Sequence, residues 1–255
     1  MEVKVRLFGI DLDPVHLEEA ARRVIALAKD GGPCRYVVTP NVDHVLIFQR
    51  TEGLRVAYSE AALVIADGLP LVLAAQLFGR PVPERVAGSD LVPAVFANAS
   101  ERAPLRVFLL GAGPGVAERA ARRIQDRWKG VHVVGTYSPP FGFERDPVEN
   151  QRILANIEAA RVELLIVGLG APKQELWVHA HRRDIAASAA LCVGATIDFL
   201  AGEKSRAPAW MRRTGLEWVH RMSTEPRRLV PRYASNAVGF PILLLKEWRE
   251  LRSGP

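Results

Sequence analysis

The sequence predicts an α/β protein with a Rossmann-like, mostly parallel sheet that has helices on both faces, followed by a helical, basic C-terminal appendage. Up to about Ala201, short runs that are apolar throughout alternate with longer stretches of helical periodicity. This pattern is typical of parallel strands buried on both faces and joined by helical crossovers. Beyond that residue no further strand is evident, and proline, tryptophan and arginine become frequent. We therefore expect a core over residues 1–201 and an appendage over residues 202–255.

The first part of the core begins with an alternating segment, residues 3–10, which predicts a strand. Asp13-Pro14 then has the residue types of a helix N-cap and first turn, and Gly31-Gly32 follows the expected helix 14–29. An apolar run and a Pro40-initiated helical run to about residue 51 come next. The remaining expected elements are a short helix 54–60, a strand 63–66, a buried helix 69–78 and a helix 90–100.

The second part of the core repeats the alternation more regularly, as expected for successive strand and helix units of one sheet. Apolar runs of strand length alternate with amphipathic stretches of helix length. The expected strands are 35–38 (from the first part), 106–110, 131–135, 163–167 and 190–193, and the expected helices are 115–128, 147–160 and 173–183.

Charge is distributed unevenly along the chain. Of the 34 Lys/Arg and 28 Asp/Glu, ten and four lie in residues 206–255, so this tail carries the whole net charge of +6. A neutral body with a basic tail predicts an anionic partner, either a nucleic acid or an anionic membrane surface. The apolar run 237–245 is too short to span a membrane, and basic residues follow it. It is typical of an interfacial segment or of a core-packing helix with a solvated basic face.

Glycine and polar residues gather where the expected strands end, which is where open parallel sheets bind ligands. Asp67 is either a base beside an anionic substrate, backed by Arg85, or only the cap of the next helix. Thr39 and Asn41 suit either capping or ligand contact. Asp198 is either a turn residue or a ribose acceptor. These positions predict a site at the carboxyl edge of the sheet.

Three glycine-rich loops precede helices and can approach an anion through backbone N–H groups. The loop 111–115 only resembles a dinucleotide fingerprint, because its spacing differs and no acid ends the next strand; tight packing is the alternative. In loop 168–175, Lys173 sits at a helix N-terminus, which is unfavourable unless an anion binds there. No Cys/His cluster has zinc spacing, so we expect no metal or other cofactor. The two cysteines, in apolar strand-like runs, fit free thiols of a cytosolic protein.

Taken in order, nine segments resemble the WecG/TagA/CpsF family of bacterial glycosyltransferases. Each is moderately specific alone, but the ordered set covers nearly the whole chain. The segments are residues 39–45, 66–72, 78–91, 108–121, 133–143, 167–175, 193–202, 206–218 and 225–233.

The resemblance implies an activity and its partners. Family members transfer an N-acetylmannosamine-type sugar from a UDP donor to polyprenyl-diphosphate-linked N-acetylglucosamine, in teichoic acid or other surface polysaccharide synthesis. They invert the anomeric carbon without a metal. The resemblance places the protein at the cytoplasmic face of the membrane as a peripheral protein, with the basic appendage against anionic lipid. A nucleic-acid partner is disfavoured, because no DNA- or RNA-binding motif is present.

The resemblance also assigns roles to residues. It implies Asp67 as the general base, Thr39 and Asn41 as positioning residues, and Arg85 as a diphosphate ligand. The residues it implies for substrate binding are Gly111, Tyr137, Gly170, Lys173, Gln174, Asp198, Arg221, Arg227, Arg228 and Arg232, the arginines either in the site or on the membrane.

Two other functions remain compatible with the residues. An NAD(P)-dependent oxidoreductase would use the loop 111–115, although the ribose-binding acid is missing. A non-catalytic nucleotide-binding module would bind UDP without turnover, whatever residue stands at position 67. The sequence leaves open the exact donor sugar, the polymer pathway and the oligomeric state.

Overall fold

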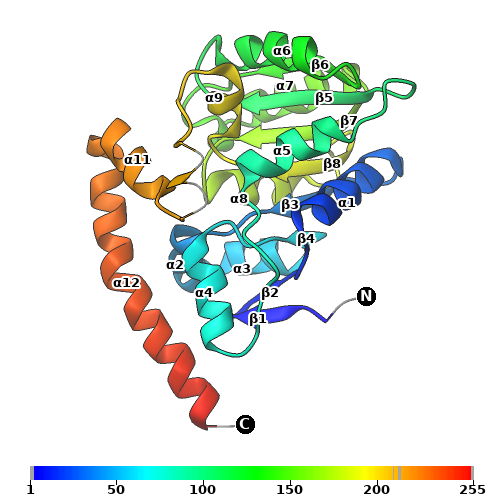
Figure 1. Cartoon of the computed structure of the whole chain (residues 1–255). Coiled ribbons are helices and arrows are strands. Elements are labelled where there is room, and N and C mark those ends of the chain that lie inside the picture. Colours follow the sequence, from blue (N-terminus) through cyan, green and yellow to red (C-terminus); the bar gives the residue numbers. More distant parts are fainter. Residues whose placement is uncertain (1–2, 209, 212–213, 254–255) are drawn as a thin grey trace.

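The computed structural model, which describes residues 3–208, 210–211 and 214–253, contains a six-stranded parallel sheet (Figure 1). Positions 209, 212 and 213 of the family-like segment 206–218 lie outside the described residues. The strand order is β4-β3-β8-β7-β5-β6, and every neighbouring pair is parallel. The prediction of an α/β fold is confirmed. The strands are β3 (Arg35–Val38), β4 (Leu63–Val64), β5 (Leu105–Gly111), β6 (Val131–Tyr137), β7 (Val162–Gly168) and β8 (Ala187–Cys192).

Helices cover both faces of the sheet, because alternate strand side chains enter two separate apolar cores. In β7, Leu165 and Val167 join one core, while Leu164 and Ile166 join the other. The first face is covered by α2 (Val42–Arg50), α3 (Glu52–Ser59), α7 (Pro147–Ala159) and α8 (Lys173–His181). The second is covered by α1 (Leu17–Lys29), α5 (Gly88–Ala97), α6 (Val116–Arg127) and α9 (Thr196–Ala201).

The N-terminal segment corrects one prediction. The single strand expected over residues 3–10 is instead an antiparallel hairpin of β1 (Val5–Leu7) and β2 (Ile10–Leu12), separate from the main sheet. Phe8 and Gly9 form the two-residue turn with φ values of 52° and 81°. Such left-handed pairs match the twist of hairpin strands. Phe8 tolerates this conformation while its side chain is buried.

The start of the first helix was also predicted wrongly. Helix α1 begins at Leu17 rather than at residue 14, and Asp13 does not cap it. The Asp13 carboxylate instead accepts a hydrogen bond of 2.8 Å from the Val64 backbone N–H, and it lies 3.2 Å from the Lys4 ammonium. Asp13 therefore fastens the hairpin to strand β4.

Most other boundaries agree within a few residues. Helix α4 (Leu69–Leu77) follows β4 as expected, and the 3-10 turn η1 (Phe143–Arg145) leads into α7. Strand β8 begins three residues earlier than residue 190 because the small residues Ala187 to Ala189 pair with β3 and β7.

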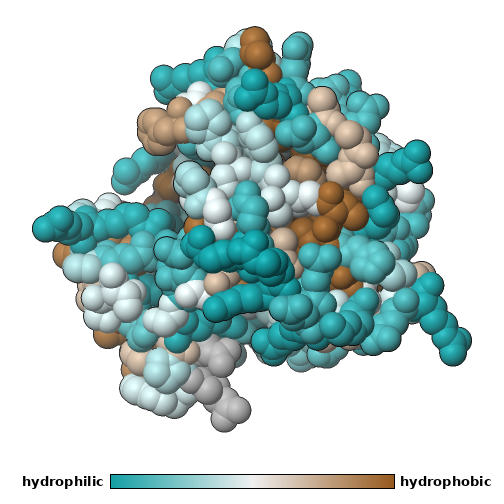
Figure 2. Space-filling model, turned by 90° about the horizontal axis from the view of Figure 1, so that it is seen from above, coloured by the Kyte–Doolittle hydropathy of each residue, from teal (hydrophilic) through white to brown (hydrophobic). Residues whose placement is uncertain are grey.

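Seen from above, the face over α6 is largely hydrophilic, with scattered apolar side chains (Figure 2).

The C-terminal appendage includes two helices whose bounds the structure describes. After α11 (Glu217–Thr224), the long helix α12 (Pro226–Ser253) runs down one side of the body and packs on α2 (Figure 1). A Cβ atom added at Gly239 would lie 3.1 Å from the Leu46 side chain of α2, and the rings of Phe240 and Phe8 lie 5.6 Å apart. Within the described residues, no helix has the length and apolar composition needed to cross a membrane.

Gly111 provides a test of the packing between β5 and β7. A Cβ atom there would lie 2.4 Å from the Gly168 carbonyl oxygen, and its φ is +117°. We expect Gly111→Ala to lower the free energy of unfolding by about 3 kcal/mol, combining backbone strain with overpacking. Gly142→Ala is the control, because Gly142 also has a positive φ but no atom within 4 Å of an added Cβ. It should cost about 1 kcal/mol. Equal urea midpoints for the two variants would contradict the packing argument.

Candidate active site

A cavity of about 450 Å³ lies beyond the carboxyl ends of β3, β4 and β8. This is where the two parts of the sheet meet, β3–β4 on one side and β8 with the remaining strands on the other. Open α/β sheets bind ligands at such a change of strand order. The body supplies one wall and the appendage the other. The polar lining comprises Asn41, Asp43, Asp67, Arg85, Ser89, Thr196, Glu217, Arg221, Arg232, Tyr233 and Asn236.

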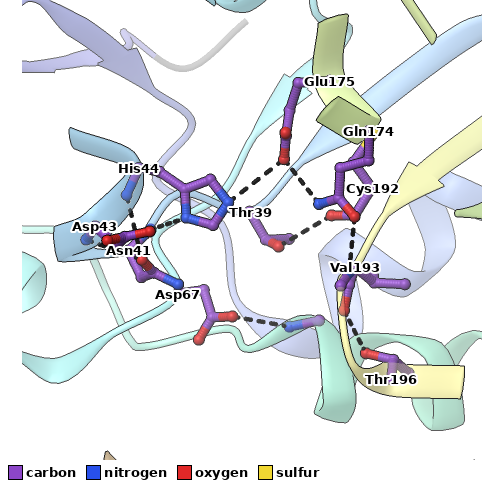
Figure 3. A network of polar contacts seen from close by, with 12 residues as sticks. Thr39, Asn41, Asp43, His44, Asp67, Gln174, Glu175, Cys192, Val193 and Thr196 are labelled. Carbon is purple, nitrogen blue, oxygen red and sulfur yellow. Dashed lines mark hydrogen bonds and ion pairs between the residues drawn. The ribbon is translucent and has the colours of Figure 1, made fainter. Parts of the chain in front are cut away.

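Asp67 follows the short strand β4 and lines this cavity. Its backbone N–H donates a 2.8 Å hydrogen bond to the Pro40 carbonyl, which fixes the chain, and its carboxylate accepts from the Gly88 N–H at 3.5 Å (Figure 3). Burial raises the pKa of Asp67 to about 6, helped by nearby Glu217 and opposed by Arg85. Asp67 is therefore a stronger base than an ordinary aspartate, yet largely ionised at neutral pH.

Arg85 lies between two carboxylates. Its guanidinium is 3.2 Å from Asp90 in α5 and 3.4 Å from Glu217 in α11, and its side chain is 19% exposed. Arg206 also reaches Asp90, at 2.9 Å. Arg85 thus joins the body to the appendage and also lines the cavity.

Asn41 performs both roles that the sequence left open. Its side-chain oxygen caps α2 by accepting from the backbone N–H groups of Asp43 and His44, and the residue also lines the cavity. The His44 ring completes a capping box, because its Nδ1 accepts from the Asn41 N–H at 3.3 Å. The sequence pattern did not reveal His44.

A buried polar network connects this cap to the first turn of α8 (Figure 3). His44 Nε2 lies 3.4 Å from Glu175, which is fully buried and accepts a 2.8 Å hydrogen bond from Gln174. The Gln174 oxygen in turn accepts from the Gly194 N–H at 3.1 Å. The network therefore joins the ends of β3 and β8, and it occupies both polar atoms of the Gln174 amide.

The four appendage arginines implied as substrate ligands by the sequence divide into two pairs. Arg221 and Arg232 line the cavity, and Arg232 lies 2.5 Å from Asp43 of α2. The Nε atoms of both are buried without a hydrogen-bond partner in the structure. Arg228 instead pairs with Glu225 at 2.7 Å, and Arg227 is exposed, both away from the cavity lining. Only the first pair faces the space beside Asp67.

Several predicted residues lie at strand ends outside the cavity lining. Thr39 is buried and donates a 3.2 Å hydrogen bond to the Cys192 carbonyl. Tyr137 donates to Glu149. Lys173 lies 3.2 Å from Glu144 and over the Phe141 ring, so a protein carboxylate already compensates its charge. The others outside the lining are Gly111, Gly170, Gln174 and Asp198.

Two of these residues, Gly111 and Asp198, have neighbours that bear on the alternatives raised by the sequence. Gly111 packs against β7, which supports the tight-packing interpretation of its loop. Asp198 lies in α9, 4.0 Å from Lys204, and burial raises the pKa of its carboxyl group. Gly170 has a φ of +81° at the turn before α8. In the part of the chain that the structure describes, no group of three or more His, Cys, Asp or Glu residues is placed to hold a metal ion.

Two further residues were not identified from the sequence. Glu217 lines the cavity from α11, although its local sequence reads as an ordinary amphipathic helix start. Glu175 is fully buried, and its position next to Gln174 in a helix gives no sign of that burial. Glu217 is placed by Arg85, 132 residues earlier in the chain, and Glu175 by His44, which is similarly distant. No local sequence pattern carries such information.

The raised pKa of Asp67 predicts how stability depends on pH. Folding favours the protonated Asp67 carboxyl. The stabilisation of the fold by this group is complete below the unfolded pKa near 4 and is lost as the pH rises through about 6. Asp67→Asn should therefore be more stable than the parent at pH 7.5 by about 1–3 kcal/mol. This gain should vanish near pH 4. Urea unfolding at both pH values measures it, with the exposed Asp11→Asn as control. A gain that is independent of pH would refute the assignment.

Comparisons with known proteins agree over most of the chain. A model of the glycosyl transferase WecG/TagA/CpsF family matches residues 5–254. The chain is 29% identical over 206 residues to an N-acetylglucosaminyldiphosphoundecaprenol N-acetyl-beta-D-mannosaminyltransferase of Bacillus spizizenii, covering 78% of this chain and 77% of the relative. It is 26% identical over 227 residues to a protein of the same name from Staphylococcus aureus strain MRSA252, covering 89% and 87%.

The family match extends through the core and the appendage, and the resemblance inferred from the nine segments is thereby confirmed. The oxidoreductase alternative loses its basis, because its loop packs against β7 and the matched family consists of glycosyltransferases. The chain belongs to the WecG/TagA/CpsF family of glycosyl transferases.

Proposed function

We propose that this enzyme transfers an N-acetylmannosamine-type sugar from a UDP donor to polyprenyl-diphosphate-linked N-acetylglucosamine, for cell-wall or surface polysaccharide synthesis. The relatives from Bacillus spizizenii and Staphylococcus aureus carry names that state this transfer to a diphosphoundecaprenol-linked acceptor. The observation that carries the proposal is the placement of Asp67, whose pKa is raised to about 6, in one cavity with Arg85, Arg221 and Arg232.

Asp67 is the general base of the proposed reaction. Its carboxylate accepts the proton of the acceptor hydroxyl as that oxygen forms a bond to the anomeric carbon of the donor. The bond from this carbon to the diphosphate breaks at the same time, and UDP leaves with the electron pair. Attack opposite the leaving group inverts the anomeric centre. One carboxylate suffices, because UDP leaves without protonation, unlike the leaving group in glycoside hydrolysis.

Arginine side chains stabilise the charge that develops on the leaving diphosphate, without a metal ion in this proposal. Guanidinium groups bind phosphate through two parallel hydrogen bonds. Arg85 already lies beside two carboxylates, and a diphosphate would replace Glu217 on one side of it. The unpartnered Nε atom of Arg221 supplies a further donor. Asn41, held by the His44 cap, positions the reacting groups.

The appendage docks on the cytoplasmic face of the membrane as a peripheral contact. Toward the end of α12, Ile242, Leu245 and Trp248 are 62%, 56% and 44% exposed. Lys246, Arg249 and Arg252 accompany them. An apolar helix face flanked by cations binds at the interface of an anionic bilayer.

The first test measures acceptor-dependent UDP release in EDTA, with UDP-N-acetylmannosamine and a short-chain polyprenyl-diphosphate-N-acetylglucosamine. Asp67→Asn should lower kcat by at least about 10²-fold, the low end for loss of a general base. In the parent, kcat/KM should rise with pH through about 6 and then level off, because only ionised Asp67 accepts the proton. Asp11→Asn, on the surface, is the matched control.

Other outcomes of this assay distinguish the alternatives. UDP binding without turnover by the parent, unchanged in Asp67→Asn, would indicate a non-catalytic nucleotide-binding module. If another UDP-sugar supports UDP release and UDP-N-acetylmannosamine does not, the protein is still a transferase but uses a different donor. Loss of activity in EDTA that Mg²⁺ restores would contradict the metal-independent mechanism.

Membrane docking predicts an effect of charge at one end of α12. Replacing Lys246, Arg249 and Arg252 by Gln should weaken binding to phosphatidylglycerol vesicles at least tenfold, at about 1 kcal/mol for each cation. Co-sedimentation measures the affinity. The matched control replaces Arg122, Arg123 and Arg127 of α6, which are exposed on another side of the molecule, with the same change in charge. Equal losses in both triple variants would show that only net charge matters.

A further inference from the structure

Helix α4 carries a stripe of leucines that begins in the cavity. Leu69, Leu73 and Leu77 are spaced four residues apart and therefore lie along one side of the helix. Leu69 lines the cavity, whereas Leu73 and Leu77 are 52% and 72% exposed. The stripe thus continues the apolar cavity wall out to the protein surface.

Helix α12 carries a second stripe with the same spacing. Ala237 and Pro241 line the cavity, and Leu245, four residues further, is 56% exposed. Arg232 and Tyr233, one to two turns earlier, also line the cavity. From Arg232 to Pro241 the helix rises by about 13 Å, so its cavity face changes from basic to apolar over that distance.

Contacts at both ends of α4 place the two helices alongside each other. Next to the cavity, Leu69 and Pro70 of α4 share its lining with Phe240 of α12. Further along, the Phe8 ring lies 6.3 Å from Phe78 and 5.6 Å from Phe240. Beyond that, Arg80 lies 3.7 Å from Glu247. Both stripes therefore lead from the cavity in the same direction, toward the end of α12 that carries Lys246, Arg249 and Arg252.

We infer that the isoprenoid chain of a polyprenyl-diphosphate ligand leaves the cavity between α4 and α12, along these two stripes. The inference rests on the proposed function, which supplies the ligand class. A polyprenyl diphosphate has a charged end and a long apolar end, and the cavity presents arginines at one end and aliphatic side chains at the other. Exposed apolar side chains that continue a pocket are typical of a ligand-binding surface. The diphosphate remains near Arg232, and the first isoprene units pass Ala237 and Leu69.

The two native cysteines make a direct test possible. Cys34 and Cys192 are both buried, at 6% and 0% exposure, so an introduced cysteine will be the accessible thiol. Ala237 is exposed and lines the cavity, whereas Ala234 is exposed on the same helix but outside the lining. Ala237→Cys and Ala234→Cys in the full chain therefore form a matched pair of small substitutions.

The experiment follows maleimide labelling of each variant with farnesyl diphosphate, inorganic pyrophosphate or no addition. Farnesyl diphosphate, at about ten times its dissociation constant, should slow labelling of Ala237→Cys about tenfold, because an occupied site excludes the reagent. Pyrophosphate should protect much less, and neither ligand should protect Ala234→Cys. The parent protein measures the background labelling of the native thiols.

Three results would overturn the inference: no protection by farnesyl diphosphate, equal protection by pyrophosphate, or equal protection of both positions. The last would indicate nonspecific coating of α12 by lipid. Labelling requires no turnover, so the readout is independent of the UDP-release assay. Protection without any UDP release would remove the proposed function alone, whereas turnover without protection would remove only this route for the isoprenoid chain.

Discussion

The arrangement of the site depends on Arg85, whose guanidinium is shared by Asp90 of the body and Glu217 of the appendage. A second ion pair, between Asp43 and Arg232, joins the same two parts. Half-buried ion pairs recover little more than their cost of desolvation. The groups that hold the appendage in place are therefore also groups that an anionic ligand can recruit. Attachment of the appendage and the chemistry of the cavity cannot be varied separately.

Much of the fold was predictable from the sequence because buried parallel strands are apolar throughout. The runs 106–110 and 163–167 have only one interpretation once amphipathic helices follow them. The hairpin was missed because its turn places Phe8 in a left-handed conformation that this residue type rarely adopts. The start of α1 was misplaced because Asp13, a good cap by type, binds Val64, 51 residues away.

The candidate site was predictable only in part. Position at a strand end identified Asn41 and Asp67, since sheet topology brings such residues together. Lys173 and Gln174 were equally good candidates by pattern, but their partners Glu144 and Gly194 lie about 20 to 30 residues away and occupy their polar groups. Glu217 was missed for the converse reason. A helical acid is ordinary in sequence, and only the docking of α11 places it beside Arg85.

The position of Glu217 links two equilibria, the protonation of Asp67 and the attachment of the appendage to the body. Burial, helped by the Glu217 carboxylate of the appendage, raises the pKa of Asp67, so attachment of the appendage to the body increases the proton affinity of Asp67. Such coupling is reciprocal: protonation of Asp67 must strengthen the attachment of the appendage by the same free energy. Protonation of one cavity carboxylate is thereby linked to the attachment of a whole segment of the chain, and a fall in pH through about 6 should tighten that attachment.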